Sequence, residues 1–192
     1  MKKLLLIAAA FVALTAFTTF SGTWTNDDPH SQLGFTVTHL GIADVSGTFN
    51  DIDVTVKSTK ADFSDASFEL TAKTASIDTR VEQRNNHLKS ADFFDVEKYP
   101  SLTFRSTSLK KTSENKYQLD GDLTMHGITK PVSMNLLYKG TVENPMSKKA
   151  TAGFQITGTL KRSDFNLGGK FPSAMISDEV SIKADGEFVA NN

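Results

Sequence analysis

The chain has 192 residues, of which 21 are basic and 22 acidic, and a formal net charge of −1 at pH 7. Because these charges are mixed along the chain without a basic block, nucleic acid is not an expected partner. The absence of cysteine excludes disulfides, thiol nucleophiles and thiolate metal sites. Fourteen phenylalanines against one tryptophan and three tyrosines indicate either a large aromatic core or an apolar cavity.

The first 22 residues have the three-part layout of a secretory signal peptide. Lys2 and Lys3 precede an apolar run from Leu4 to about Leu14, and small or hydroxyl residues follow it. The alternative, a membrane anchor, needs about 20 predominantly apolar residues, and this run is shorter. We therefore expect residues 1–22 to be a signal that is cleaved between residues 16 and 23, and residues 23–192 to form one exported domain.

Beyond the signal, apolar and polar residues alternate with period two, which is typical of half-buried strands. Short turn signals separate eight such segments, at residues 33–37, 51–56, 68–73, 102–104, 117–123, 132–138, 152–160 and 180–188. Eight antiparallel strands fit either a sandwich or an up-and-down barrel. Closure is favoured because a barrel leaves no exposed strand edge, and a barrel of this size can enclose one slender ligand. The sequence therefore predicts an all-β fold, an eight-stranded antiparallel barrel.

Residues 79–99 interrupt the alternation and predict a short helical crossover segment. Thr79 and Glu82 have the spacing of a capping box, in which each side chain satisfies a free backbone amide at a helix start. We expect a helix over residues 80–89 and a second short turn over residues 90–94.

Three residues in and beside this crossover each have two possible roles. Phe93 and Phe94 need burial, and they either plug one end of the barrel as core or line its mouth. Asp78 either caps the helix or holds the crossover loop in place.

The sequence offers little that is specific to catalysis. It contains no G-x-S-x-G elbow, no H-E-x-x-H pair and no phosphate-binding glycine loop. The four histidines, His30, His39, His87 and His126, match no helix-borne metal motif. We therefore expect neither a catalytic residue nor a metal or other cofactor.

Short motifs run in order through nearly the whole chain after the signal. They are Asp28-Pro29-His30-Ser31, Phe35-Thr36-Val37-Thr38-His39, Gly47-Thr48-Phe49, Ser76-Ile77-Asp78-Thr79, Arg84-Asn85-Asn86-His87-Leu88, Asp92-Phe93-Phe94-Asp95, Tyr99-Pro100, Phe104-Arg105-Ser106, Gly121-Asp122-Leu123-Thr124-Met125-His126-Gly127-Ile128-Thr129-Lys130-Pro131-Val132 and Lys161-Arg162-Ser163-Asp164-Phe165. In type and order these motifs resemble those of the YceI-like proteins.

The resemblance implies an extended, lipocalin-like barrel, usually periplasmic, that binds polyisoprenoid chains such as quinone tails or prenyl phosphates in an apolar pore. It implies no catalytic residues, and it leaves room for a homodimer and for transient contact with a membrane. The chain departs from the family pattern twice: Asn85 follows Arg84 where aspartate is common, and Asn166 follows Phe165 where glycine is usual.

On this basis the expected function is to bind and carry, or sequester, a long isoprenoid lipid. The candidate ligand-binding residues are Phe35, Phe104, Leu123 and Phe154 for the pore, Phe93 and Phe94 for the mouth, and His39, Arg84, His87 and Arg162 for a polar headgroup. Two alternatives stay open: a stress-protective or structural protein with a packed barrel, and an enzyme on a small amphiphile that uses His39 and His87 as acid and base.

Overall fold

The structure, a computed structural model, describes residues 22–191. The predicted signal peptide lies outside these residues. Within residues 22–191, one α-helix, α1 (Glu82–Lys89), accompanies eleven strand segments. The segments are β1 (Gly22–Asn26), β2 (Gln32–His39), β3 (Ala43–Phe49), β4 (Ile52–Ser58), β5 (Ser67–Lys73), β6 (Ile77–Asp78), β7 (Ser101–Ser113), β8 (Lys116–Met125), β9 (Ile128–Glu143), β10 (Ala150–Lys161) and β11 (Glu179–Asn191).

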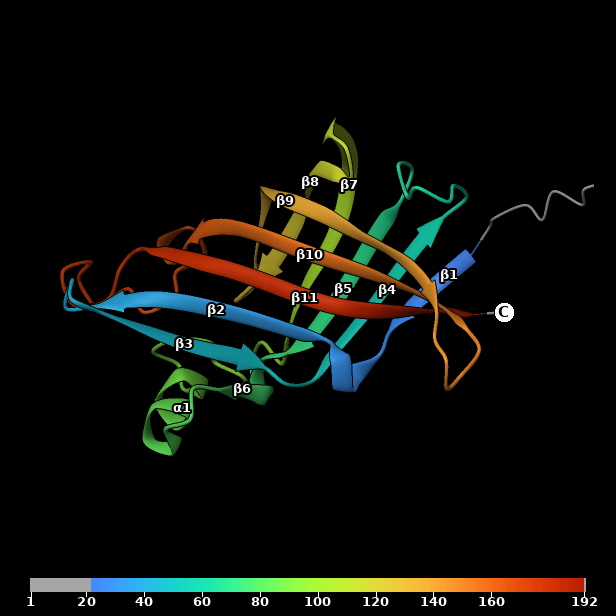
Figure 1. Cartoon of the computed structure of the whole chain (residues 1–192). Coiled ribbons are helices and arrows are strands. Elements are labelled where there is room, and N and C mark those ends of the chain that lie inside the picture. The colour runs from blue at the N-terminus through green and yellow to red at the C-terminus, as the bar shows by residue number, and fades with distance from the viewer. Residues whose placement is uncertain (1–21, 192) are drawn as a thin grey trace, which may run out of the picture.

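The strands close into an eight-stranded antiparallel barrel, which confirms the predicted fold (Figure 1). Around the ring the order is β1, β4, β5, β7, β8, β9, β10 and β11, and β1 pairs with β11 to complete it. The remaining segments continue strands of this ring after short interruptions. A 3₁₀ turn at Asp28–His30 separates β1 from β2, residues 50–51 separate β3 from β4, and a second 3₁₀ turn at Thr74–Ser76 separates β5 from β6.

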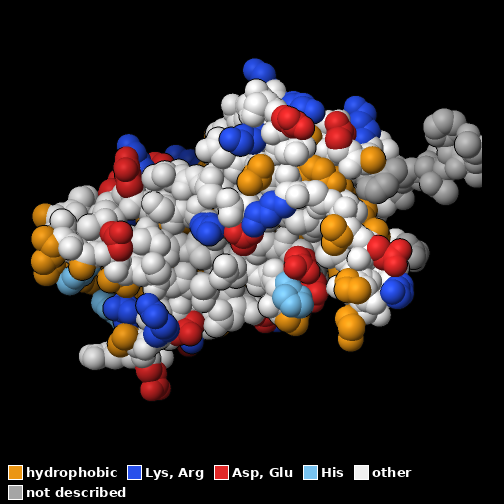
Figure 2. Space-filling model, in the orientation of Figure 1, with side chains coloured by type: hydrophobic (Ala, Val, Ile, Leu, Met, Phe, Trp, Pro, Cys, Tyr) orange, Lys and Arg blue, Asp and Glu red, His pale blue; other side chains and the backbone are white. Residues whose placement is uncertain are grey.

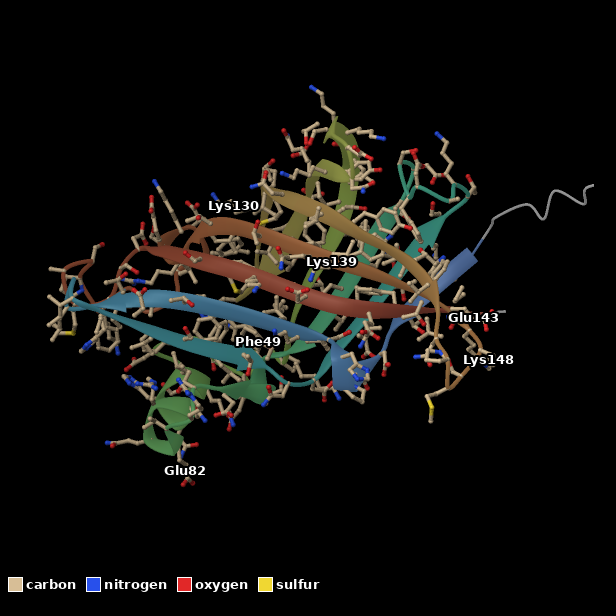
Figure 3. All side chains as sticks on the ribbon, in the orientation of Figure 1. Phe49, Glu82, Lys130, Lys139, Glu143 and Lys148 are labelled. Carbon is tan, nitrogen blue, oxygen red and sulfur yellow. The ribbon has the colours of Figure 1, made fainter. Side chains whose placement is uncertain are left out.

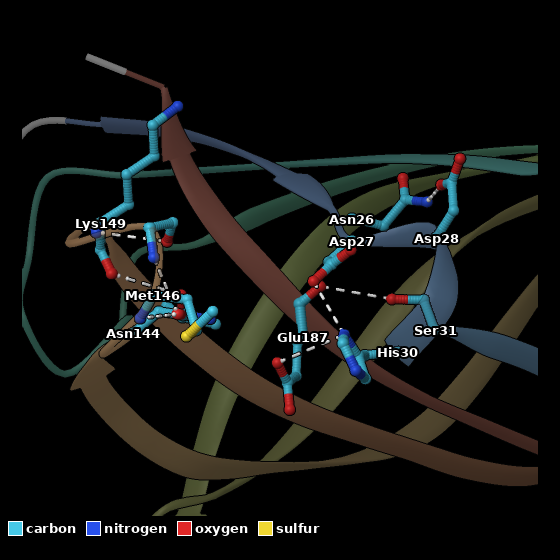
Figure 4. Close-up of polar contacts among 11 residues, drawn as sticks. Asn26, Asp27, Asp28, His30, Ser31, Asn144, Met146, Lys149 and Glu187 are labelled. Carbon is cyan, nitrogen blue, oxygen red and sulfur yellow. Dashed lines mark hydrogen bonds and ion pairs between the residues drawn. The ribbon is translucent and has the colours of Figure 1, made fainter.

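The sheet forks along β11. Its last residues, Phe188–Asn191, pair with β1, whereas Ser181–Asp185 pair with β2. Figure 4 shows the turn between β1 and β2 at this fork, where His30 lies beside Asp27 and Glu187. Beyond the fork, β2 pairs with β3, and these two strands extend the barrel toward the end that holds α1 (Figure 1).

Two buried clusters occupy the two ends of the barrel interior. The Trp24 cluster comprises Trp24, Val56, Phe63, Ala66, Phe68, Tyr117, Leu119, Leu136, Ala152, Phe154 and Phe188, and it fills the end where β1 meets β11. The Phe93 cluster comprises Phe49, Ala72, Ile77, Phe93, Phe94, Leu102, Leu123, Met125, Phe165 and Leu167, at the end beside α1. In Figure 3, Phe49 lies between the strands, and Glu82 points away from the barrel.

The crossover contains a helix, as expected, but the predicted capping box is wrong. The helix begins at Glu82 after Val81, with no side-chain cap, because Arg80 adopts a positive φ of 64° that breaks the helical path. Thr79 is buried instead, and its hydroxyl donates to Asn85 Oδ1 at 2.7 Å. Residues 91–94 form a turn that is not helical. Within residues 22–191, no helix has the length and apolar character needed to cross a bilayer.

Asp78 holds the crossover loop, which was one of its two expected roles. Its Oδ1 atom accepts hydrogen bonds from the backbone N–H of Arg80 and from Asn85 Nδ2, both at 2.8 Å. The bond from Arg80 contributes most, followed by that from Asn85, and together they lower the pKa of Asp78.

Candidate ligand-binding site

A cavity of about 490 Å³ lies inside the barrel, between the two buried clusters. Its volume is within the range of about 300–1,000 Å³ that is usual for small-molecule sites. The inward-facing residues of β11, Val180, Ile182 and Ala184, line it and keep partial exposure although they point into the barrel. Since packed core residues lose nearly all exposure, the interior is hollow here. A solidly packed barrel, one of the expected alternatives, does not fit this structure.

Aromatic rings from the Trp24 cluster form the floor of the cavity. Phe154 lies at their centre, with ring centroids 5.0 Å from Phe63, 5.4 Å from Phe68 and 5.4 Å from Phe188. These three contacts have the edge-to-face geometry that aromatic pairs prefer. Because the rings interlock, this end of the barrel is closed to a long ligand.

The opposite end of the cavity is its mouth, framed by three segments. The β2–β3 hairpin contributes His39, α1 contributes His87, and the connection between β10 and β11 contributes Met175; all three line the cavity and are exposed. Phe93 stacks on Phe171 with centroids 5.1 Å apart, and His87 lies edge-on to both rings. The mouth therefore combines aromatic surface with imidazole groups.

Arg84 is the cationic side chain that α1 directs toward the cavity. Its Nε donates to Thr79 Oγ1 and its Nη2 donates to the Thr79 carbonyl, both at 2.8 Å. These bonds fix the guanidinium against a buried threonine. In the described part of the chain the Nη1 group has no hydrogen-bond partner, so it can donate to a ligand.

His87 belongs to a small charged group on the rim of the mouth. Its Nε2 is 3.4 Å from Asp92 Oδ2, and Lys170 Nζ is 2.5 Å from Asp92 Oδ1. The hydrogen bond from Lys170 contributes most to lowering the pKa of Asp92, followed by the bond from His87. The Asp92 carboxylate is thus paired with the Lys170 ammonium, which offsets its negative charge at the mouth.

Arg162 has a different role from the headgroup contact expected of it. It is only 7% exposed, and all five of its N–H groups donate to backbone carbonyls at 2.5 to 3.2 Å. The five acceptors are the carbonyls of Leu167, Gly168, Phe171, Ile176 and Ser177. No donor is left for a headgroup, so Arg162 shapes the mouth by holding the loop that carries Phe171 and Met175.

All ten predicted site residues line this one cavity. Phe93 and Phe94, whose role was open between core and mouth, are buried in the Phe93 cluster and also face the cavity. His126, in contrast, lies outside it and donates from Nδ1 to the Phe165 carbonyl at 3.0 Å.

A sequence comparison decides the family. The YceI-like domain matches residues 24–188. The chain belongs to the YceI family. A UPF0312 protein of Photorhabdus laumondii is 38% identical to this YceI chain over 168 residues, which cover 86% of each protein.

Solved structures agree with the YceI fold. Burkholderia cenocepacia BcnA superposes with a TM-score of 0.74 at 27% identity, over 86% of this chain and 99% of BcnA. A polyisoprenoid-binding domain from Saccharophagus degradans, at 15% identity, has a TM-score of 0.66 over 89% of this chain and 99% of that domain, and so shares the fold.

Several residues that line the YceI cavity were not among the predicted site residues. Leu33, Val37 and Ile156 line it and belong to strands that the alternation had identified, so the same pattern could have found them. Phe171 and Met175 come from an irregular connection without periodicity, and nothing in the sequence indicated that this segment reaches the mouth.

Proposed function

We propose that the protein binds a long isoprenoid lipid and carries or sequesters it, with the chain in the barrel and the head at the mouth. The observation that carries this proposal is the apolar cavity, closed by aromatic rings at one end and open at the other. The polyisoprenoid-binding domain from Saccharophagus degradans has the same fold, which supports the ligand class.

The cavity supplies its binding free energy by burying hydrocarbon. Burial is worth about 0.8 kcal/mol per methylene, so three isoprene units of roughly fifteen carbons correspond to a gross gain of about 12 kcal/mol. Ordering the ligand and losing its free motion offset part of that gain. Since a micromolar Kd corresponds to about 8 kcal/mol, apolar contacts account for most of such an affinity.

The mouth would select the headgroup. Arg84 offers a free Nη1 group, and His39 and His87 add two imidazoles that become cationic when protonated. Charge-assisted hydrogen bonds from such groups favour a phosphate or another anionic head over a bare alcohol. A prenyl phosphate therefore fits the site better than the corresponding prenol.

We also propose that the protein acts in the periplasm after export by its N-terminal signal. The supporting observation is the charged, then apolar, then small-residue order of residues 1–22. Mass spectrometry of the mature protein from its host should give an N-terminus between residues 16 and 23, and an intact N-terminus would contradict export by cleavage.

Filling the cavity with a side chain of the protein tests the lipid proposal. Ala184 lines the cavity on β11, so Ala184→Phe places a ring where the lipid would lie. We expect affinity for added farnesyl phosphate to fall at least about tenfold, which is 1.4 kcal/mol. Overpacking a filled core costs about 1–3 kcal/mol, whereas this ring enters empty space, so stability in urea should change little.

Ser181→Phe is the matched control, because it adds the same ring to the exposed outer face of the same strand. It should leave binding unchanged. Organic extracts of wild-type protein purified from its host should contain an isoprenoid detectable by mass spectrometry. The proposal fails if no lipid is recovered and wild-type protein binds no added prenyl compound.

A further inference from the structure

Three large apolar side chains are exposed together at the mouth of the barrel. Leu40 is 53% exposed, Ile42 is 85% exposed and Met175 is 41% exposed. We call these three residues the apolar tip. Figure 2 shows hydrophobic side chains gathered at the end of the molecule where the β2–β3 hairpin turns, beside a histidine. Clustered exposed apolar residues of this kind mark a contact surface.

The apolar tip is held in place by backbone hydrogen bonds. The N–H of Leu40 donates to the Met175 carbonyl at 2.9 Å, and the N–H of Ile42 donates to the His39 carbonyl at 3.1 Å. Leu40 has a φ of 52°, a left-handed conformation that asparagine or glycine adopts at less cost than leucine. The turn therefore carries a bulky apolar side chain at a position where local backbone energetics favour a small or polar one.

The tip is continuous with the cavity. Met175 belongs to the tip and also lines the cavity, together with Val37 and Val45 on the two strands of the hairpin. An apolar path thus runs from the exposed tip to the interior. The opposite end of the molecule also exposes Val142 and Met146, but neither residue lines the cavity and the Trp24 cluster fills the barrel there.

The ionisable side chains of the cavity lining at the mouth are basic, and the carboxylate on its rim, Asp92, is paired with Lys170. The basic side chains are His39, Arg84, His87 and Lys161, together with Arg162, whose donors are all used. The one carboxylate in the cavity lining, Asp185, sits in the part of β11 beside the fork and is paired with Lys139. Asp44, two residues beyond Ile42, accepts a hydrogen bond from Thr38 Oγ1 at 3.0 Å. The positive charges of Arg84 and Lys161 at the mouth complement the anionic phosphates of a bilayer surface.

We propose that the apolar tip docks the protein on an anionic lipid bilayer, so that a lipid chain passes between membrane and cavity without crossing water. This inference rests on the proposed lipid-binding function, and it names the partner at the mouth. Leu40 and Ile42 enter the acyl boundary, Met175 bridges to the cavity, and the basic groups contact lipid phosphates.

Vesicle flotation of the mature protein tests the docking. The probes are phosphatidylcholine vesicles with and without phosphatidylglycerol. Wild-type protein should float with the mixed vesicles, and added salt should weaken the association. Ile42→Asp should lower the bound-to-free ratio about tenfold or more, because it replaces an exposed aliphatic chain with an anion. Leu40→Asn should also lower it while keeping or raising stability, since asparagine suits the positive φ.

The matched control is Val142→Asp, which makes a comparable aliphatic-to-acid change at the opposite end of the molecule. It should float like wild type. Equal loss of binding in Val142→Asp and Ile42→Asp, or no flotation of wild-type protein, would overturn the docking proposal.

Binding of farnesyl phosphate added from solution separates this proposal from the function on which it rests. Leu40 and Ile42 do not line the cavity, so both tip variants should bind dissolved farnesyl phosphate as wild type does. They should load a prenyl lipid from vesicles more slowly. If wild-type protein binds the dissolved ligand but ignores vesicles, docking fails and the cavity function stands. If wild-type protein binds neither, the proposed function fails.

Discussion

The buried side chain of Arg162 holds the loop between β10 and β11 in its conformation. Its planar guanidinium presents five N–H donors in a fixed geometry, and the loop between β10 and β11 folds around it with five carbonyls. Each of those carbonyls would otherwise need a partner in a region that is largely shielded from water. Arg162 therefore fixes the shape of the mouth by holding the loop that carries Phe171 and Met175.

Arg162→Lys should show this role. An ammonium has three donors, so at least two of the five carbonyls lose their partner, and each unsatisfied buried group costs about 1–3 kcal/mol. We expect the free energy of unfolding in urea to fall by at least about 2 kcal/mol. Arg105→Lys is the control, because Arg105 is exposed and pairs with Glu69 on the surface; its effect should stay within about 0.5 kcal/mol. Equal effects would contradict the assigned role.

At the residue scale, the sequence predicted the direction of apolar side chains well, but it did not predict the hydrogen-bond partners of polar side chains. Phe35, Leu123 and Phe154 line the cavity because strand alternation fixes their direction. The role of Arg162 depends on carbonyls that converge only after the loop has folded, and no local pattern encodes that. Asn166, which stands where the resemblance led us to expect glycine, has a φ of 55° and so adopts the left-handed conformation that glycine and asparagine tolerate best.

At the scale of elements, the turn between β1 and β2 joins the two courses of the forked sheet. His30 Nδ1 lies 2.9 Å from Asp27 Oδ2 within the turn and 3.9 Å from Glu187 Oε2 on β11, so protonated His30 links the turn to β11 through Glu187 (Figure 4). The hydrogen bond with Asp27 contributes most to raising the pKa of His30, followed by the charges of Asp27 and Glu187. Protonation of His30 therefore stabilises the folded turn between β1 and β2 against β11.

This arrangement predicts a pH dependence of stability. A pKa raised by folding gives a stabilisation that is complete below the unfolded value of 6.5 and is lost as pH rises through the folded value. The free energy of unfolding of wild-type protein, minus that of His30→Gln, should therefore decrease between about pH 6 and about pH 8. Urea titrations of both proteins across this range would measure it. Subtracting the His30→Gln values removes the contribution of the other histidines to the pH dependence. A difference that stays constant with pH would contradict the stabilising role of protonated His30.

The strand prediction omitted β1, β3 and the two-residue β6, and the omission of β3 is instructive. β3 was not identified because its inward positions are Val45, Gly47 and Phe49, and the glycine interrupts the apolar alternation. The structure explains that glycine: a Cβ at position 47 would lie 2.5 Å from the ring of Phe35. The missing side chain at Gly47 on β3 leaves room for the ring of Phe35 on the neighbouring strand β2. The alternation within one strand cannot reveal such a dependence on the adjacent strand.

At the scale of the whole molecule, the barrel has a packed half and a hollow half. The Trp24 cluster gives the first half interlocked aromatic contacts, whereas the inward residues of β2, and Val45 of β3, face the cavity and stay partly exposed. Local stability follows such differences in buried contact, so different strands open with different free energies. Closure of the barrel was predictable from eight alternating strands, but this division was not, because inward apolar residues look alike whether they meet a neighbour or a void.

Native-state hydrogen exchange should resolve the two halves. Amides of β1, β4 and β8, around the Trp24 cluster, should exchange most slowly, and those of β2 and β3 should exchange faster. Farnesyl phosphate at 100 times its Kd stabilises the bound state by about 2.7 kcal/mol, so β2 and β3 should slow by up to about a hundredfold. In Ala184→Phe the ring occupies the cavity, so β2 and β3 should already be protected and respond little to the lipid. Uniform exchange across all strands, with an equal response to lipid, would mean that the two halves unfold as one unit.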